Sequence, residues 1–231
     1  MTPPPRWRII LDSPCPATEQ MARDVTLATE AIPTVRLFRW DPPAISFARA
    51  QTPPTWLQEA QMGADLEGVQ RPTGGGIAFH GSDVSCSVVV PSVMGYSLRE
   101  SMERVCESAA TLCLSYGVET TVALESVQDE CITYCLTQPS PYALYIDGCK
   151  VAGFAVRRYP EMWLIQGSLL VRPLPRALIE VVPGEVQEQL AVCARPLSVC
   201  VTESVDEGHV ADRWAEHWSA WWEQRVEVAV H

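Results

Sequence analysis

The sequence predicts an α+β fold, and three observations support this prediction. Short segments rich in β-branched and aromatic residues alternate along the chain with segments of helical periodicity. An Asp147-Gly148 pair joins two of the strand-like segments, which is a strong signal for a β-hairpin. The run SCSVVVP is dense in β formers and stops at Pro91. Because the 231 residues contain no linker or low-complexity segment, we expect one domain over residues 1–231.

The N-terminal part of the chain is predicted to contain three strands and two helices. We expect strands at residues 7–11, 35–40 and 44–48, and helices at residues 16–30 and 56–62. Thr18 is a candidate N-cap of the first helix. The segment VRLFRW alternates apolar and basic residues, so we expect a half-buried strand in which Arg36 and Arg39 form the solvated face.

The clearest helix lies at residues 97–116, where apolar residues recur at helical spacing. Ser97 followed by Glu100 is typical of a capping box, and Gly117 is the candidate C-cap. A strand at residues 119–124, the Asp147-Gly148 hairpin and a strand from Met162 are expected next. The segments LPRALIEVV and VQEQLAVCA then predict two helices separated by Pro183-Gly184.

A final helix is predicted from His209 onward. Its tryptophans at positions 214, 218, 221 and 222 share one face at i, i+4, i+7 and i+8 spacing. Such a stripe is typical of a helix packed on a core, and a contact surface for a partner is the alternative interpretation.

Three consecutive glycines stand out in the stretch of residues 70–91, QRPTGGGIAFHGSDVSCSVVVP. Gly74, Gly75 and Gly76 have no Cβ, so the backbone can adopt positive φ and a ligand can approach main-chain N–H groups closely. On the glycines alone, an ordinary hairpin turn without a ligand is the simpler interpretation.

The composition excludes several classes of function. A formal net charge of −11 argues against non-specific nucleic-acid binding, and an acidic protein partner would need a local basic patch. No stretch reaches the roughly 18 apolar residues of a membrane span, and the N-terminus lacks the features of a signal peptide, so we expect a cytoplasmic protein without membrane contact. We expect all nine cysteines to be reduced, and Cys106 and Cys113 to be buried. No metal site is predicted, because neither CxxC pairs nor zinc-type histidine spacing occur.

Two residues near the Asp147-Gly148 turn are candidates for chemistry. Lys150 follows the turn in an otherwise apolar strand, where lost solvation would lower its pKa or make it a fixed cation aimed at a carbonyl or phosphate. Cys135 precedes a loop with two prolines, and a nearby cation would favour its thiolate. An ordinary hairpin lysine and a core cysteine are the alternatives, and Cys131 and Cys149 compete for the role of nucleophile.

Two separated motifs resemble those of lipoate-protein ligases and octanoyltransferases, whose catalytic domain resembles that of biotin ligases. RPTGGGIAFHGSDVSCSVVV (residues 71–90) resembles the family's Arg-x-x-Gly-Gly-x-x-x-x-His element, and DGCKVAGFAVRR (residues 147–158) its Asp-Gly-x-Lys-Ile-x-Gly-x-Ala element. Weaker agreement extends over nearly the whole chain. The resemblance implies a mixed, mainly antiparallel sheet flanked by helices, of the biotin/lipoate ligase catalytic-domain type.

The resemblance also implies which residues form the site. YCLTQPSPYALYIDGCK is similar to the approach to the lysine in cysteine-dependent octanoyltransferases, which places the nucleophile at Cys135 and the family lysine at Lys150. The implied substrate-binding residues are Arg71, Thr73, Gly74, Gly75, Gly76, Phe79, His80, Gly153, Phe154 and Ala155. Phe154 stands where family members commonly have serine, Val156 where they often have glutamine, and Gly81-Ser82-Asp83 replaces a more usual His-Asp.

The family contains two chemistries. A transferase takes octanoate from the thioester of acyl carrier protein through a cysteine acyl-enzyme to a lysine of a lipoyl-domain or glycine cleavage H-type protein, and needs no cofactor. A ligase activates lipoate with ATP and Mg²⁺ and usually has an accessory C-terminal domain. We expect the transferase, because the chain stops soon after the catalytic domain and the ligase's Arg-Asn-Asp is absent before Lys150. The third glycine and Phe79-His80 look more like a ligase, and the changes at Phe154 and Val156 leave a catalytically silent carrier-binding homologue as a third alternative. A biotin ligase is disfavoured, because its Gly-Arg-Gly-Arg loop is missing.

Overall fold

The computed structural model describes residues 6–63, 66–125, 132–221 and 227–230. Its main sheet has eight strands in the order β11-β1-β2-β6-β10-β9-β8-β7, and a smaller sheet has the order β4-β3-β5. In the main sheet only the β11–β1 and β1–β2 pairs are parallel. The expected mixed, mainly antiparallel sheet is therefore confirmed. The strands are β1 (Arg8–Leu11), β2 (Thr34–Phe38), β3 (Ala44–Phe47), β4 (Glu67–Gln70), β5 (Ala78–His80), β6 (Asp83–Pro91), β7 (Thr121–Ala123), β8 (Ala143–Ile146), β9 (Cys149–Arg158), β10 (Met162–Leu170) and β11 (Glu227–Val230).

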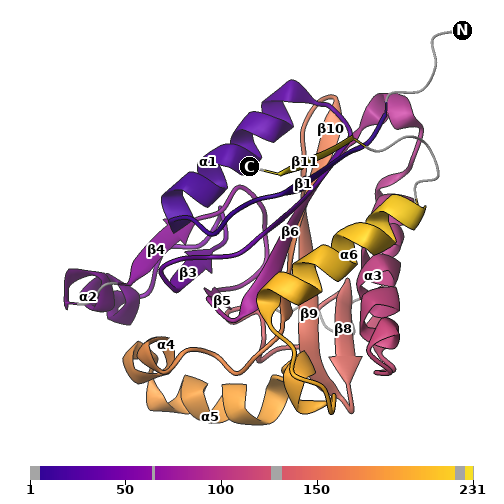
Figure 1. Ribbon diagram of the computed structural model, residues 1–231. Coiled ribbons are helices and arrows are strands. Elements are labelled where there is room, and N and C mark those ends of the chain that lie inside the picture. The colour runs from indigo at the N-terminus through magenta and orange to yellow at the C-terminus, as the bar shows by residue number, and fades with distance from the viewer. Residues whose placement is uncertain (1–5, 64–65, 126–131, 222–226, 231) are drawn as a thin grey trace, which may run out of the picture.

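Helices flank the main sheet, as the sequence predicts (Figure 1). Two long helices, α3 (Leu98–Ser115) and α6 (Glu207–Trp221), pack against each other and against one face of the sheet. Helix α1 (Ala17–Glu30) contacts β4, β6 and β10. The remaining helices are α2 (Thr55–Gly63), α4 (Arg176–Val181) and α5 (Gly184–Cys193). Side chains alternate along β6, so that Val88 joins the core below α3 and α6 while Val89 joins the smaller core below α1.

Local signals for helix ends are confirmed at the start of α3 and wrong at α1. Ser97 accepts a hydrogen bond from the main-chain N–H of Glu100, whose carboxylate accepts from the N–H of Ser97, which is a full capping box. The C-cap of α3 is Tyr116, and Gly117, the predicted C-cap, is the next residue, with φ of +76°. Helix α1 begins at Ala17 after Pro16, with no side-chain cap, so Thr18 lies inside the helix. Pro16 already has the extended backbone that an N-cap requires, which explains the earlier start.

The prediction of a half-buried β2 with solvated arginines is wrong for Arg36. All five residues of β2 are buried, and the guanidinium of Arg36 bonds to the carboxylates of Asp12 and Asp24 and to the side chain of Gln20. These partners come from α1 and the segment before it, which cover this face of the sheet. A buried arginine is tolerated here because its charge is paired and its donors are used. Arg39, beyond the end of β2, is half-buried.

The glycine segment is not a hairpin. Strands β4 and β5, which precede and follow it, both pair with β3 and lie on opposite sides of it. The three glycines therefore cross from one edge of the small sheet to the other. In contrast, the hairpin at Asp147-Gly148 is confirmed, with both residues at positive φ as a two-residue β-turn requires.

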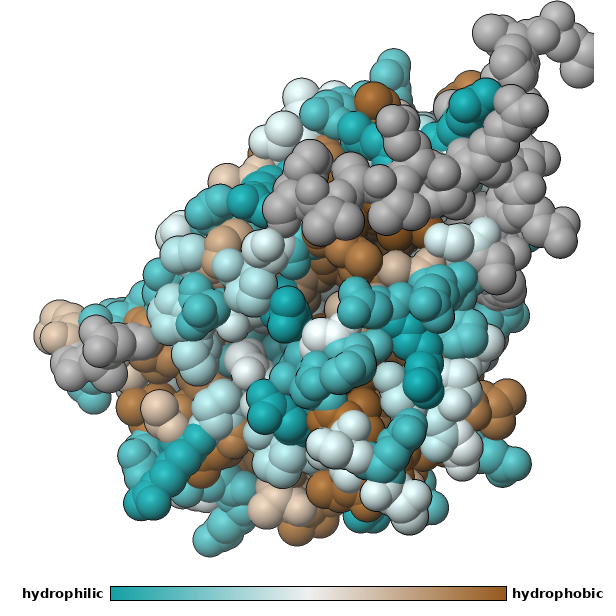
Figure 2. Space-filling view, in the orientation of Figure 1, coloured by the Kyte–Doolittle hydropathy of each residue, from teal (hydrophilic) through white to brown (hydrophobic). Residues whose placement is uncertain are grey.

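The tryptophan stripe of α6 faces the core where the structure describes its side chains. Trp214 and Trp218 are fully buried, and Trp214 Nε1 donates to Ser108 Oγ of α3 over 2.8 Å. The outer face of α6 is mainly hydrophilic in Figure 2, as core packing requires. The side chain of Trp221 and all of Trp222 lie outside the described residues, as does Cys131. Strand β11, which pairs with β1, is absent from the sequence-based prediction.

Eight cysteines lie within the described parts of the chain, and all have free thiols. Cys106 and Cys113 are fully buried, as predicted. Among the described residues, no three histidine, cysteine or acidic side chains are grouped closely enough to hold a metal ion. None of the described helices has both the length and the apolar character to cross a membrane.

Candidate active site

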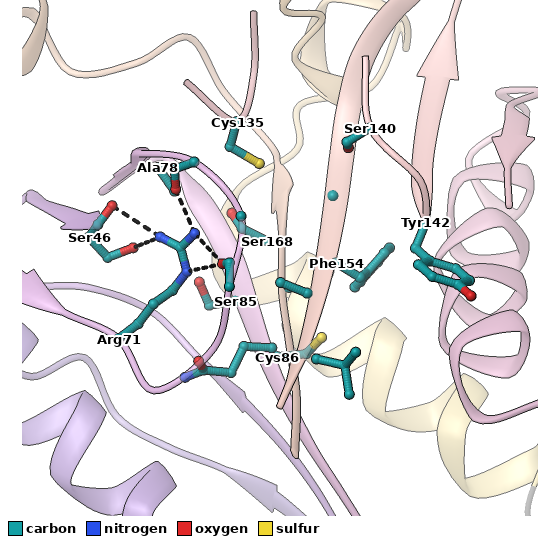
Figure 3. A pocket seen from close by; sticks show the side chains of 18 of the residues that line it. Ser46, Arg71, Ala78, Ser85, Cys86, Cys135, Ser140, Tyr142, Phe154 and Ser168 are labelled. Atoms are coloured by element: carbon teal, nitrogen blue, oxygen red, sulfur yellow. Dashed lines mark hydrogen bonds between the residues drawn. The ribbon is translucent and has the colours of Figure 1, made fainter. Parts of the chain in front are cut away.

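A cavity of about 310 Å³ lies between the glycine segment, β3, β9, β10 and the segment that leads to β8 (Figure 3). Most of the residues singled out from the sequence line it: Arg71, Gly74, Gly75, Gly76, His80, Cys135, Gly153, Phe154 and Ala155. Three do not line it. Thr73 donates to the side chain of Gln166 over 2.7 Å, Phe79 stacks on Tyr134 in a separate core cluster, and Lys150 lies behind the cavity wall.

Cys135 is held in place by main-chain bonds to the glycine segment. Its N–H donates to the carbonyl oxygen of Ile77, and the N–H of Ile77 donates to that of Thr133, each over 2.7 Å. Only glycine fits at position 76, because an added Cβ would lie 2.9 Å from the main chain of Thr133. The two motifs that are far apart in sequence are thus joined beside the candidate nucleophile.

The sulfur of Cys135 lies over Gly153 of β9. A Cβ atom at position 153 would come within 3.2 Å of Sγ, so the absence of a side chain there gives the thiol its room. Ala155, the next residue on the same face of β9, lies near Gly75 of the glycine segment. The small residues Gly153 and Ala155 on β9 and Gly75 in the glycine segment therefore leave open space in front of the sulfur of Cys135.

Lys150 is buried, with only 2% of its surface exposed, and its ammonium group is fully bonded. Nζ donates to the carbonyl oxygens of Cys135 (2.7 Å) and Gln138 (2.6 Å) and to Oγ of Ser140 (2.8 Å). Burial lowers the pKa of Lys150, and the negative charge of a Cys135 thiolate opposes this effect. The lysine therefore anchors the main chain of the cysteine and places its charge close to the thiol.

Arg71 is the second buried cation beside Cys135. Its guanidinium donates to the carbonyl oxygens of Gly74 (2.7 Å) and Gly76 (2.5 Å) and to the main chain and hydroxyl of Ser46 (both 3.1 Å). Burial lowers the pKa of Arg71, and a Cys135 thiolate raises it. The glycine segment thus binds the Arg71 guanidinium through its carbonyl oxygens, and the positive charge of Arg71 interacts with a thiolate at Cys135.

His80 belongs to a chain of buried polar groups that ends at Arg71. Its Nδ1 bonds to the carboxylate of Asp83 (2.9 Å), its Nε2 to the hydroxyl of Ser46 (2.8 Å), and its ring stacks on Trp40 at 4.0 Å. Since Ser46 accepts from Arg71, its own hydrogen is available to His80 Nε2, and a proton on Nδ1 satisfies Asp83. The carboxylate of Asp83 thus reaches the imidazole of His80 although the two residues are three positions apart in sequence.

Burial alone would raise the pKa of Asp83. Its attraction to His80 and the hydrogen bonds from His80, Ser168 and Gly81 outweigh burial and hold the pKa below the usual value of 3.8. Sequence reasoning singled out neither Ser46 nor Ser140. The available signals were a serine inside the apolar strand AISFA and a serine between two prolines.

The cavity also borders the opposite face of β9. Phe154 lies on the side of the strand away from Arg71 and Ser46, toward Tyr142 (Figure 3). Its ring covers Gly167 of β10, where a Cβ would lie only 2.0 Å from the ring. Cys86, which is paired with Gly167 across the sheet, is fully buried, and burial raises the pKa of its thiol far above the ordinary value. This part of the lining is apolar, in contrast to the polar part around Arg71.

Two octanoyltransferases are similar to this chain in sequence. The octanoyltransferase LipM of Symbiobacterium thermophilum is 28% identical over 218 residues, which cover 86% of this chain and 78% of the relative. That of Kyrpidia tusciae is 29% identical over 198 residues, which cover 76% and 69%.

Solved structures share the fold. A T. acidophilum lipoate protein ligase with bound lipoic acid superposes with a TM-score of 0.76 at 16% identity, over 98% of this chain and 89% of that one. Lipoate-protein ligase A bound with ATP gives a TM-score of 0.73 at 15% identity, over the same shares of the two chains. The biotin protein ligase of Aquifex aeolicus gives 0.51 at 11% identity, over 94% and 69%. These likenesses confirm the expected biotin/lipoate ligase type of fold. Because residues 16–206 match the family described as the Lipoyl protein ligase A/B catalytic domain, the chain belongs to that family.

Proposed function

We propose that this protein is an acyltransferase that moves an octanoyl or lipoyl group from an acyl carrier protein thioester, through an acyl-enzyme on Cys135, to a lysine of a lipoyl-domain or glycine cleavage H-type protein. The observation that carries the proposal is the position of Cys135: its sulfur faces the cavity over Gly153, next to the buried cations Arg71 and Lys150. The names of the LipM relatives support octanoyl transfer in particular.

The chemistry requires two displacements. The Cys135 thiolate adds to the carbonyl carbon of the donor thioester, the tetrahedral adduct expels the donor thiolate, and the acyl group remains on Sγ. The neutral amine of the acceptor lysine then adds to this thioester, and the C–Sγ bond breaks with its electron pair on the sulfur. The proton that the amine loses as the amide forms goes to Sγ or to solvent. Fixed positive charge near the sulfur stabilises the thiolate at the start and at the end of the cycle. Neither step uses ATP, so no cofactor is required.

The experiment is acyl-enzyme detection by mass spectrometry after incubation with octanoyl-acyl carrier protein. A thioester on Cys135 is expected in the wild-type protein and not in Cys135→Ala. Lys150 is the only lysine in the sequence, so a hydroxylamine-labile adduct is easily distinguished from a stable amide on that residue. Cys149→Ser is the matched control, because Sγ of Cys149 bonds to the carbonyl oxygen of Val192 and does not line the cavity. Cys131→Ser tests the other competing thiol.

The ATP-dependent alternative is tested with the same acceptor. A lipoyl-domain protein is incubated with octanoyl-acyl carrier protein alone, or with lipoate, ATP and Mg²⁺. Modification only in the second mixture contradicts the proposal and supports a ligase. Modification in neither mixture supports a catalytically silent carrier-binding homologue. Full transfer by Cys135→Ala rules out the assigned nucleophile.

A further inference from the structure

The ammonium group of Lys150 has no hydrogen atom left for a substrate. An ammonium group has three donors, and those of Lys150 are used by two main-chain carbonyl oxygens and by Ser140 Oγ. Lys150 also does not line the cavity, whereas Ser140 and Cys135 both do. A negative charge that develops on the acyl oxygen in the cavity therefore needs another donor.

Ser140 is placed to be that donor. Its hydroxyl accepts from Lys150 Nζ over 2.8 Å, so its own hydrogen remains free to point elsewhere. A hydroxyl that accepts from a cation becomes a stronger donor, because the two bonds polarise each other. In Figure 3 the side chains of Ser140 and Cys135 lie at the same end of the cavity.

The position of Ser140 is also rigid. It stands between Pro139 and Pro141, which restrict the backbone on both sides. Its main-chain N–H donates to the hydroxyl of Tyr145 over 3.2 Å, and Lys150 Nζ lies 5.9 Å from the ring of the same tyrosine. A donor held in this way needs little reorganisation when charge develops nearby.

We propose that Ser140 is a catalytic residue that donates a hydrogen bond to the acyl oxygen in the transition state, and that Lys150 acts through it. The inference rests on the function proposed above. As Sγ of Cys135 bonds to the carbonyl carbon, the π electron pair moves onto the oxygen, which accepts from Ser140 Oγ–H. When the carbonyl re-forms, the donor thiolate leaves with the electron pair of its bond to carbon. Ser140 and Lys150 keep their protons throughout, so no further reactant is needed.

The test compares acylation with alkylation of Cys135 in Ser140→Ala. Acylation by an octanoyl thioester creates an oxyanion, whereas alkylation by iodoacetamide at the same sulfur does not. We expect single-turnover acylation to slow roughly 100- to 1,000-fold, as for the loss of one oxyanion donor, with the substrate KM and the alkylation rate unchanged. Thr137→Val is the matched control, because this hydroxyl lies in the same loop and is buried without a partner.

The role of Lys150 is tested by a double-mutant cycle with Lys150→Met. If the lysine acts through Ser140, the double variant acylates no more slowly than the slower single variant. If the rate losses of the two single variants multiply in the double variant, the two residues act independently and the coupling is contradicted. An equal slowing of acylation and of alkylation in Ser140→Ala would show that Ser140 acts only on the thiol. Unchanged acylation in Ser140→Ala overturns the inference. That result leaves the proposed function standing as long as Cys135→Ala forms no acyl-enzyme, so the two failures are distinguishable.

Discussion

The sulfur of Cys135 and the α-carbon of Gly153 lie so close that a side chain on the glycine would contact the thiol. An alanine Cβ at position 153 would come within 3.2 Å of Sγ, which is tighter than an ordinary contact. This relationship joins the segment before β8 to the middle of β9. A side chain at position 153 would therefore crowd the sulfur of Cys135.

Gly153→Ala is therefore expected to slow acylation of Cys135 at least about tenfold, since a displaced nucleophile loses its alignment with the carbonyl carbon. The loss in the free energy of unfolding should be small, because Sγ can rotate away. Single-turnover acylation and urea unfolding measure the two effects. Gly184→Ala is the control, because a Cβ there has no atom within 4 Å. Normal acylation in Gly153→Ala contradicts the assigned geometry.

Gly76 and Gly74 lie in the same glycine segment, but the space for a side chain differs between them: a Cβ fits at position 74 and not at position 76. A Cβ at position 76 would lie 2.8 Å from Ile132 and 2.9 Å from the main chain of Thr133, while one at position 74 would have nothing within 4 Å. We expect Gly76→Ala to lower the free energy of unfolding by about 1–3 kcal/mol, through the forced backbone shift, and Gly74→Ala to change it little. Chemical denaturation of both variants measures this difference. Equal effects would show that the contact between the glycine segment and residues 132–133 is absent.

Phe154 limits the cavity on the far face of β9. Phe154→Ala removes the ring that covers Gly167, so we expect long-chain acyl thioesters such as dodecanoyl to gain in rate relative to octanoyl. Gly167→Ala is the opposing variant, because its Cβ would lie 2.0 Å from the ring and push it from its place. Gly167→Ala should lower the free energy of unfolding by about 1–3 kcal/mol in the wild-type protein and by less in the Phe154→Ala background. An unchanged chain-length preference in Phe154→Ala would mean that the acyl chain does not reach this part of the lining.

The lowered pKa of Asp83 predicts that the folded protein loses stability in acid. Its pKa is lower in the folded protein than the usual 3.8, so its stabilising contribution is present above that value and is lost as the pH falls through the folded-state pKa. Asp83→Asn should lower the free energy of unfolding by roughly 1–3 kcal/mol near neutral pH, because buried partners lose a carboxylate acceptor. The difference from wild type should shrink as the pH falls below the usual value of 3.8 and through the folded-state pKa. A difference that stays constant with pH would show that the carboxylate is not the source of the stability.

Around the candidate site, the sequence predicted local structure where neighbouring residues determine the outcome. The Asp147-Gly148 turn places Lys150 at the start of β9, and the alternation of a strand then brings Gly153 and Ala155 to one face. The motif resemblance identified Cys135, which the structure places in the cavity. Neither turn chemistry nor periodicity could show that Lys150 bonds to the main chain of Cys135 or that Ser140 lies between the lysine and the cavity. Those contacts depend on how the loop before β8 folds back.

What the sequence determined by itself was local: the helix α3 with its capping box, the hairpin, the inward tryptophans of α6 and the α+β class. The tertiary structure decided the rest. Arg36 is buried because Asp24 of α1 and Asp12 before that helix pair with its charge. The glycine segment crosses the small sheet because β4 and β5 pair with β3. The physical reason is that caps, turns and periodicity involve residues a few positions apart. Ion pairing and strand pairing instead join distant segments, whose meeting depends on the burial of the whole chain.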